Sequence, residues 1–267
     1  MTYRTILLDL TADEQVEARL DVARSLASRF DAALIGMHVS PPPLQLAAWQ
    51  GGMSVYIPPE VVEAQRKANQ EAKERVRAAF DRVCGDDPAA EWREAEGDPG
   101  QLLAEAAHAA DLVVTAGGGG SPDVAERLVT ATGVPVLALP PGAARDLGRV
   151  VLVAWKGSPE AARAAHDALP FLQTAERVVL CAVGERSAAG LDAAAAMLGR
   201  HQVRVRPERA GGTDASAGEV LLAQAAAHGA DLLVMGAYGH ARVRELVFGG
   251  ATRRVLCDAT LPVLFSG

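Results

Sequence analysis

The sequence is poor in cysteine and in aromatic residues. Its three cysteines, Cys84, Cys181 and Cys257, are scattered and form no CxxC pair or Cys/His cluster. This spacing argues against a disulfide framework and against structural zinc, so we interpret them as buried thiols in a reducing compartment. Aromatic residues make up only 4% of the chain. The predicted core is therefore built from Ala, Val and Leu, with alanine-rich helices packed on Val/Leu strands.

Long apolar runs and excess positive charge are also missing. No run approaches the roughly 18 apolar residues that a membrane span needs. The chain opens directly on a predicted strand and has no signal-peptide layout. Its formal net charge is −7 and its pI is near 5.4, which argues against a protein that coats nucleic acid. We therefore expect a cytoplasmic protein with neither membrane nor nucleic acid as a partner.

What the sequence does contain is one domain written twice. HAADLVVTAGGGG near residue 110 returns as HGADLLVMGAYGH near residue 230. RTILLDL, which begins at Arg4, returns as RVVLVAW from Arg149, and VPVLAL returns as LPVLFS. Such repetition at a fixed spacing indicates a duplicated unit. We predict two domains, residues 1–140 and 149–267, joined by a short linker.

Strands alternate with helices in both repeats, which predicts parallel sheets with right-handed crossovers. Ligands in such sheets bind at the carboxyl ends of strands where the winding direction reverses. In each repeat that crevice is expected between the first and fourth strands. Capping signals predict that helices begin at Thr11, Asp98, Ser158 and Ser216. The expected strands span 5–10, 32–39, 91–96, 111–115 and 134–139, then 150–154, 177–183, 203–207, 231–235 and 262–265.

The loop after the fourth strand of the second repeat carries the strongest functional signal. Met235-Gly-Ala-Tyr-Gly239 is followed by nine residues and then by Gly249-Gly-Ala-Thr252, which opens a helix. Glycines let backbone amides approach a ligand, and a helix start adds unpaired N–H groups and a positive dipole end. Together they predict an anion nest of the kind that holds phosphate. The alternative is that these glycines only turn the chain and start a helix.

The pattern of Gly, two residues, Gly, nine residues and Gly resembles the ATP-binding loop of universal stress proteins. The resemblance extends to the WKGSPEA turn, the DLLVMG strand and the closing PVLF strand, and it covers both halves. It implies an α/β fold of two tandem, doubly wound, five-stranded parallel sheets of the adenine-nucleotide α-hydrolase-like type, with strand order 3-2-1-4-5. It also implies an intramolecular pseudo-dimer in which residues 134–139 lie beside residues 262–265.

The same resemblance implies an adenine nucleotide as ligand, ATP foremost, with no visible ligand set that requires Mg²⁺. It implies a stress-response sensor or regulator that acts through an unknown protein partner, and it leaves further homodimerisation open. The implied binding residues are Ala154, Val183, Gly236, Gly239, His240, Gly249, Gly250, Ala251 and Thr252.

The chain departs from the family pattern at two positions. Gly250 stands where ATP-binding members usually have Ser or Thr, and Lys156 stands where they usually have Asp; we take Thr11 as its counterpart in the first repeat. Lys156 either meets a phosphate or is a solvated surface residue. The first repeat is about eight residues shorter after Thr115. Its glycine run at 117–121 could hold an anion, but we expect this half to be a structural partner.

No catalytic set is visible. Ser158 is better explained as a helix N-cap than as a nucleophile, and the chain has no P-loop. His108 and His228 suit helix C-termini. We therefore expect no enzyme, or at most slow ATP hydrolysis. The alternatives are an interaction module with a decayed site and an adenylating enzyme. The 40–58 loop, with Trp49 and Tyr56, could be a lid, a contact surface or a cover for the core.

Overall fold

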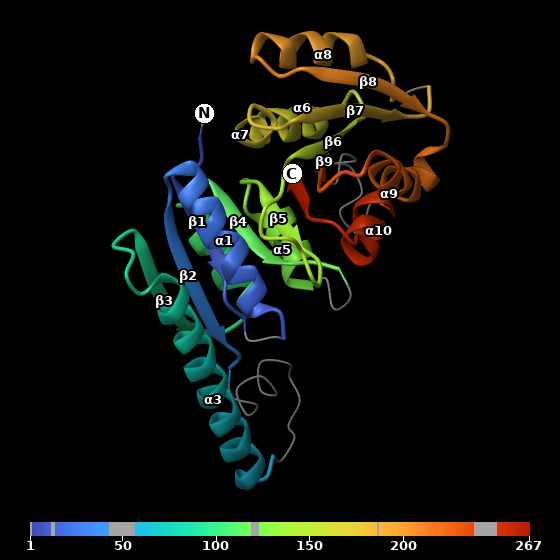
Figure 1. Ribbon diagram of the computed structural model, residues 1–267. Helices are drawn as coiled ribbons and strands as arrows, with labels where there is room; N and C mark the ends of the chain where they lie inside the picture. The colour runs from blue at the N-terminus through green and yellow to red at the C-terminus, as the bar shows by residue number, and fades with distance from the viewer. Residues whose placement is uncertain (1, 12–13, 43–56, 119–122, 186, 238–249) are drawn as a thin grey trace.

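The computed structural model describes residues 2–11, 14–42, 57–118, 123–185, 187–237 and 250–267. Within these ranges the chain forms one ten-stranded sheet covered by helices on both faces (Figure 1). The strands are β1 (Thr5–Asp9), β2 (Ala33–Ser40), β3 (Ala90–Glu96), β4 (Leu112–Ala116), β5 (Val136–Leu139), β6 (Val150–Trp155), β7 (Arg177–Val183), β8 (Val205–Ala210), β9 (Leu232–Gly236) and β10 (Val263–Ser266).

The strand order is β3-β2-β1-β4-β5-β10-β9-β6-β7-β8, which contains the predicted 3-2-1-4-5 order twice. Neighbours within each half are parallel, whereas β5 and β10 are antiparallel, with Val136 opposite Phe265. The predicted pairing of the two closing strands is therefore confirmed. Because that pairing joins the halves edge to edge, the two expected sheets form one continuous sheet with a pseudo-two-fold relation at its centre.

Two apolar layers cover the sheet, because successive strand residues point to opposite faces. Leu8 lies in the layer that contains α1, α3, α6, α7 and α8, and Leu7 lies in the layer that contains α4, α5, α9 and α10. The helices are α1 (Val16–Phe30), α3 (Pro59–Cys84), α4 (Pro99–Ala107), α5 (Asp123–Ala131), α6 (Pro159–Asp167), α7 (Leu169–Leu172), α8 (Leu191–Arg200), α9 (Ala217–His228) and α10 (Gly250–Asp258), with a 3₁₀ turn, η1 (Asp214–Ser216), before α9.

Side chains from both halves share one core. Tyr3 and Phe30 from the N-terminal half pack against Phe171 from α7, with ring centroids 5.8 and 5.2 Å from that of Phe171. Arg29 lies over the Phe30 and Phe171 rings and donates to the backbone oxygen of Leu147. This cluster joins the halves on the α1 face of the sheet, so neither half completes its core alone.

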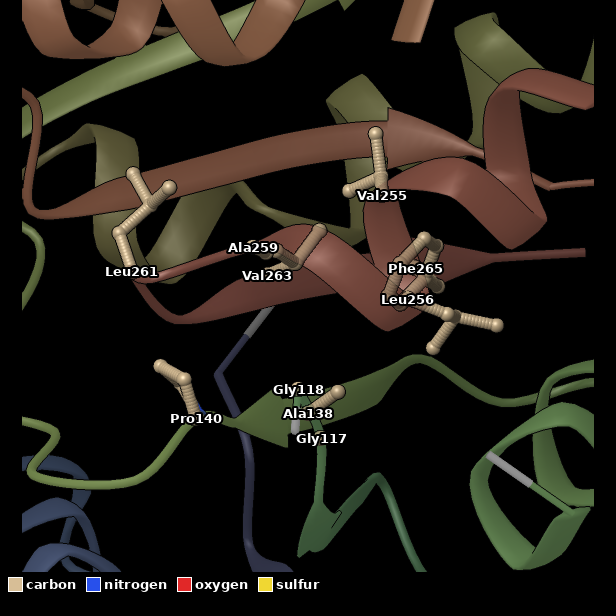
Figure 2. A pocket seen from close by; sticks show the side chains of 10 residues that line it. All are labelled: Gly117, Gly118, Ala138, Pro140, Val255, Leu256, Ala259, Leu261, Val263 and Phe265. Carbon is tan, nitrogen blue, oxygen red and sulfur yellow. The ribbon is translucent and has the colours of Figure 1, made fainter. Parts of the chain in front are cut away.

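A narrow apolar seam joins the halves on the other face (Figure 2). The backbone N–H of Gly118 donates to the oxygen of Leu256 in α10, at 3.0 Å. A Cβ at Gly118 would lie 2.7 Å from the oxygen of Ala259, and its φ is +67°, so this close approach requires glycine. The seam is filled by its own lining and is a packing contact.

One of the four predicted helix starts is wrong, and the start at Ser216 is correct but lacks the predicted side-chain cap. Helix α1 begins at Val16, after Gln15, and the Thr11 N–H instead donates to the Asp9 carboxylate, which turns the chain out of β1. The Ser216 hydroxyl turns back to Thr213 and does not cap α9. The caps at Asp98 and Ser158 are confirmed, since each side chain accepts a first-turn N–H.

None of the described helices combines the length and the apolar character that a membrane crossing requires. Cys84 and Cys181 are buried thiols as expected, but Cys257 is half-exposed. It lies near the C-terminal end of α10, whose outer side faces solvent.

Candidate functional site

The carboxyl ends of β9, β6 and β7 lie side by side in the C-terminal half, because these strands are neighbours in the sheet. Ala154 and Val183 are near the ends of β6 and β7, and Gly236 is the last residue of β9. The next described helices after β6 and β9, α6 and α10, lie on opposite faces of the sheet, which is the reversal where α/β proteins bind ligands. The predicted strand-end residues are therefore brought together at one edge.

Gly236 has a packing role at this edge. A Cβ there would lie 2.6 Å from the backbone nitrogen of Ala161 and 2.6 Å from the carbonyl carbon of Glu160. The first turn of α6 thus rests directly on the end of β9, and Ser158 starts that turn by accepting the Ala161 N–H at 3.3 Å. This glycine is required by the fold whether or not a ligand binds.

The first turns of α9 and α10 meet beside that edge. Gly218 in the first turn of α9 allows the approach, since a Cβ there would lie 3.1 Å from the oxygen and 3.3 Å from the Cα of Ala251. Gly250, Ala251 and the buried Thr252 form the first turn of α10. Two helix N-termini in contact bring two positive dipole ends together, a setting that favours an anion.

Three of the predicted binding residues lie outside the described ranges. Gly239, His240 and Gly249 belong to residues 238–249, between β9 and α10. The described flanks fix where this loop begins and ends: Ala237 donates its N–H to the oxygen of Ser266 at 2.8 Å, and α10 begins at Gly250. The spacing of the predicted nest therefore remains a prediction from the sequence.

Lys156 follows β6 at the carboxyl edge and forms an ion pair with Asp214 of η1, with 3.5 Å between Nζ and the carboxylate. Its side chain is 45% exposed. An exposed pair of this kind contributes little stability, about 0–1 kcal/mol. Lys156 is thus a surface residue directly after β6.

A buried polar cluster occupies the same position in the N-terminal half, and sequence reasoning missed it. The Asp9 carboxylate at the end of β1 accepts hydrogen bonds from the Thr115 hydroxyl at 2.7 Å and from the Thr11 N–H at 2.8 Å. Arg19 is 2% exposed, and its guanidinium donates to the backbone oxygens of Asp9 and Thr11. His38 donates from Nδ1 to the oxygen of Leu10 at 2.8 Å.

A signal for this cluster was present in the sequence. Asp9 interrupts an apolar strand, and Arg19 falls on the apolar face of α1 between Val16 and Leu20. Buried charges are rare unless they are paired or hydrogen-bonded, so charges in core positions predict a polar cluster. Thr11 is the counterpart of Lys156 in register, as we expected, and the buried carboxylate lies two residues before it.

The two halves differ in charge at this position. Leu8 pairs with Val114 and Val153 pairs with Val234, so Asp9 corresponds in register to Ala154. The C-terminal half therefore has a methyl group where the N-terminal half has a carboxylate. Removing a negative charge from the edge of β6 makes that edge more favourable for an anionic ligand.

The glycine run of the N-terminal half is used differently. Gly117 donates its N–H to the backbone oxygen of Leu139, and Gly118 donates its N–H to that of Leu256. The backbone N–H groups of both described glycines are therefore already hydrogen-bonded within the protein. The rest of the run, 119–122, lies outside the described residues. These contacts favour the structural role that we expected for this half.

The described residues contain no group of three or more His, Cys, Asp or Glu side chains that could hold a metal ion. Burial raises the pKa of the Cys181 thiol in β7 to about 11, with a smaller contribution from the negative charge of Glu208. This buried, protonated thiol is a poor nucleophile at neutral pH.

The sequence of residues 148–266 matches the model of the universal stress protein family. The match covers the C-terminal half of the chain. The whole chain also has the fold of solved universal stress proteins: that of Archaeoglobus fulgidus DSM 4304 superimposes with a TM-score of 0.72 and 16% identity, covering 97% of both chains. A candidate universal stress protein of Pseudomonas aeruginosa UCBPP-PA14 gives a TM-score of 0.62 and 15% identity, covering 99% of this chain and 93% of the other.

A comparison with curated proteins finds no match. The structural matches span both halves, and the N-terminal half repeats the strand order of the universal stress protein domain. A tandem arrangement is consistent with this layout, in which the two halves are joined through β5 and β10.

Proposed function

We propose that the C-terminal half binds an adenine nucleotide, ATP foremost, at the carboxyl edge of β6 and β9. The observation that carries this proposal is the contact between the first turns of α9 and α10 at Gly218 and Ala251. Two helix N-termini attract phosphate through their N–H groups and dipoles. The match of residues 148–266 to the universal stress protein family and the glycine spacing of residues 236–249 support the same ligand.

Each proposed binding residue has a distinct task. Gly250, Ala251 and Thr252 present the first-turn N–H groups of α10 to the phosphates, and the Lys156 ammonium can exchange Asp214 for a phosphate oxygen. Ala154 and Val183 offer an apolar surface at the strand ends. Gly236 at the end of β9 and three residues of the loop, Gly239, His240 and Gly249, complete the proposed anion nest.

The proposed role is regulatory. No nucleophile paired with a base stands at the edge among the described residues, and the nucleotide would act by changing which protein partner is bound. We propose a cytoplasmic stress-response regulator whose domains are 1–140 and 149–267, the first serving as the structural partner of the second.

A second candidate is an interaction module that binds no nucleotide. The observation in its favour is the Lys156–Asp214 ion pair, in which the Lys156 ammonium already has a carboxylate as its partner. Gly236 is also explained by the packing of α6 alone.

Calorimetric titration with ATP, ADP and AMP separates the two candidates. We expect binding by the wild type and loss of binding by Gly239→Val, because the added side chain fills the nest. Gly199→Ala is the matched control, since a Cβ at that glycine meets no atom within 4 Å. Absence of heat at millimolar nucleotide with the wild type favours the interaction module. Unchanged affinity in Gly239→Val shows that the loop is not the site.

A further inference from the structure

The two ends of the sheet, β3 and β8, each have only one partner strand among the described residues. An edge strand presents a row of N–H and C=O groups that can pair with another strand. Figure 1 shows β3 at the margin of the N-terminal half, beside α3. Either edge strand could therefore pair with a strand of another chain if its outward N–H and C=O groups are available.

The outward hydrogen-bonding positions of β3 follow from the bonds it makes to β2. Leu34 donates to the oxygen of Ala89, and Gly97 donates to the oxygen of Ser40, so odd-numbered positions of β3 face β2. Because backbone direction alternates along a strand, Trp92 and Glu94 direct their N–H and C=O groups away from the sheet. Ala90 offers its C=O outward, since its N–H already donates to Asp87.

The β8 edge is blocked by comparison. Gly184 donates to the oxygen of Ala210, which places Ala210 on the side of β7. By the same alternation Pro207 points outward in the middle of β8, and it has no N–H to donate. Strand β3 has no proline.

We propose that β3 pairs antiparallel with β3 of a second copy of this chain, with Trp92 opposite Trp92. In this register Trp92 of each copy exchanges hydrogen bonds with the other, and Glu94 donates to the oxygen of Ala90. Glu91 then lies opposite Arg93 of the second copy, twice by symmetry. These are the non-hydrogen-bonded positions, where opposing side chains are closest.

Charge selects this register over its neighbours. Shifting the pairing by two residues places either Arg93 or Glu91 opposite its own copy, and shifting it by four in one direction places Glu94 opposite its own copy, so like charges oppose these alternatives. Shifting it by four in the other direction places Ala90 opposite its own copy and loses both Glu91–Arg93 contacts. Glu91 and Arg93 are 55% and 43% exposed and already contact each other along the strand at 2.7 Å. Pairing of two copies would bring their two Glu91–Arg93 ion pairs together, so that negative and positive side chains alternate across the interface.

The Trp92 side chain on this strand is held by contacts on two sides. The Trp92 ring stacks on His38, with centroids 6.0 Å apart and an interplanar angle of 14°, and the Arg77 guanidinium lies 5.1 Å from its centroid. A groove of about 330 Å³ between α3 and β3 adjoins it, lined by Lys73, Arg77 and Asp81 among others. A preordered strand loses less entropy on pairing, and the groove gives room to the α3 side chains of the second copy.

Charge exchange tests the pairing in solution. Wild-type protein is expected to show a concentration-dependent monomer–dimer equilibrium in sedimentation velocity. Glu91→Arg alone and Arg93→Glu alone each create two like-charge contacts and should weaken self-association at least about tenfold. An equimolar mixture of the two single variants restores both opposite-charge contacts and should form heterodimers. The double variant should also regain self-association.

Arg149→Glu is the matched control, because it reverses an exposed charge that pairs with Glu176 in the other half; it should associate as the wild type does. Far-ultraviolet circular dichroism confirms that the variants are folded. A wild type that stays monomeric at millimolar concentration overturns the proposal. Dimers that persist unchanged in both single variants, or single variants that fail to associate when mixed, overturn it as well.

Discussion

At the scale of single residues, the two copies differ in charge at the end of their first strands. Asp9 is 2% exposed and accepts the hydroxyl of Thr115, which is fully buried. Ala154 takes the same register position in the C-terminal half. A buried carboxylate and hydroxyl that satisfy each other are costly to separate, since either one left alone loses its hydration without compensation.

A double-mutant cycle measures that coupling. Asp9→Ala and Thr115→Val should each destabilise the protein, and together they should cost less than their sum, with a coupling energy of about 1–3 kcal/mol. Urea denaturation of the four proteins gives the value. Thr130→Val, whose exposed hydroxyl bonds only its own helix, is the control partner and should be additive with Asp9→Ala. Strict additivity of Asp9→Ala with Thr115→Val contradicts the coupling.

The Cys181 thiol predicts an alkaline loss of stability. Burial raises its pKa from the ordinary 9.0 to about 11 in the folded protein. Between these values the unfolded chain has lost the proton and the folded chain retains it, so unfolding is favoured as pH rises. The contribution is complete below about pH 9 and is lost through about pH 11. The free energy of unfolding, measured by denaturant titration across this range, should fall less steeply in Cys181→Ala than in wild type. Equal slopes would contradict the assignment.

At the scale of elements, capping shows how local sequence signals compete with tertiary contacts. Asp98 caps α4 by accepting the Gln101 N–H at 2.7 Å, and Arg127 contacts the same carboxylate. Ser216 has the same sequence signal but bonds back to Thr213, because a 3₁₀ turn precedes α9. Both residues stand directly before a helix, as the sequence signal predicts. The 3₁₀ turn before α9 determines that the Ser216 hydroxyl bonds to Thr213 and does not cap the helix.

The two roles of Asp98 can be separated. Asp98→Ala removes the cap and the ion pair and should cost about 1 kcal/mol of unfolding free energy. Asp98→Asn keeps a capping oxygen and loses only an exposed ion pair, so it should cost less than about 0.5 kcal/mol. Thermal or urea unfolding checks both. A larger loss in the Asn variant would mean that the pair with Arg127, rather than the cap, stabilises α4.

At the scale of the whole molecule, the halves are joined through the β5–β10 pairing, the Tyr3–Phe30–Phe171 cluster and the Gly118 seam. Each of these contacts includes fully buried groups. Because the shared core crosses the boundary between the copies, we expect the two halves to unfold together.

Phe171→Ala tests that cooperativity. The ring is fully buried in the C-terminal half, and its loss should cost about 3–5 kcal/mol. Variants that keep either Trp92 or Trp155 as the only tryptophan report on the N-terminal and C-terminal halves separately. Both signals should shift to the same lower denaturant midpoint. A shift seen only by Trp155 would show that the halves unfold independently.

Sequence patterns sufficed for the repeat and for the alternation of strands and helices, whereas the strand order and the pairing of the last strands were implied by the resemblance to universal stress proteins. Apolar strands that alternate with capped helices are compatible with few fold topologies. Because the domain is duplicated, the signal for each strand and helix occurs twice. The site was predicted only in outline. Ala154, Val183 and Gly236 were placed at one edge because parallel strands end together. Gly236, however, serves α6 packing, and the Asp9 cluster depends on contacts more than 100 residues apart along the chain.

The amino-acid sequence alone determined the duplicated α/β architecture, since periodicity and turn chemistry are local properties that any segment displays by itself. Only the tertiary structure decided how the copies share one sheet, that α9 and α10 begin in contact at Gly218, and which sheet edge is left open at Trp92. These features depend on which distant backbones approach each other, and that is set by packing of the whole chain rather than by any one stretch of it.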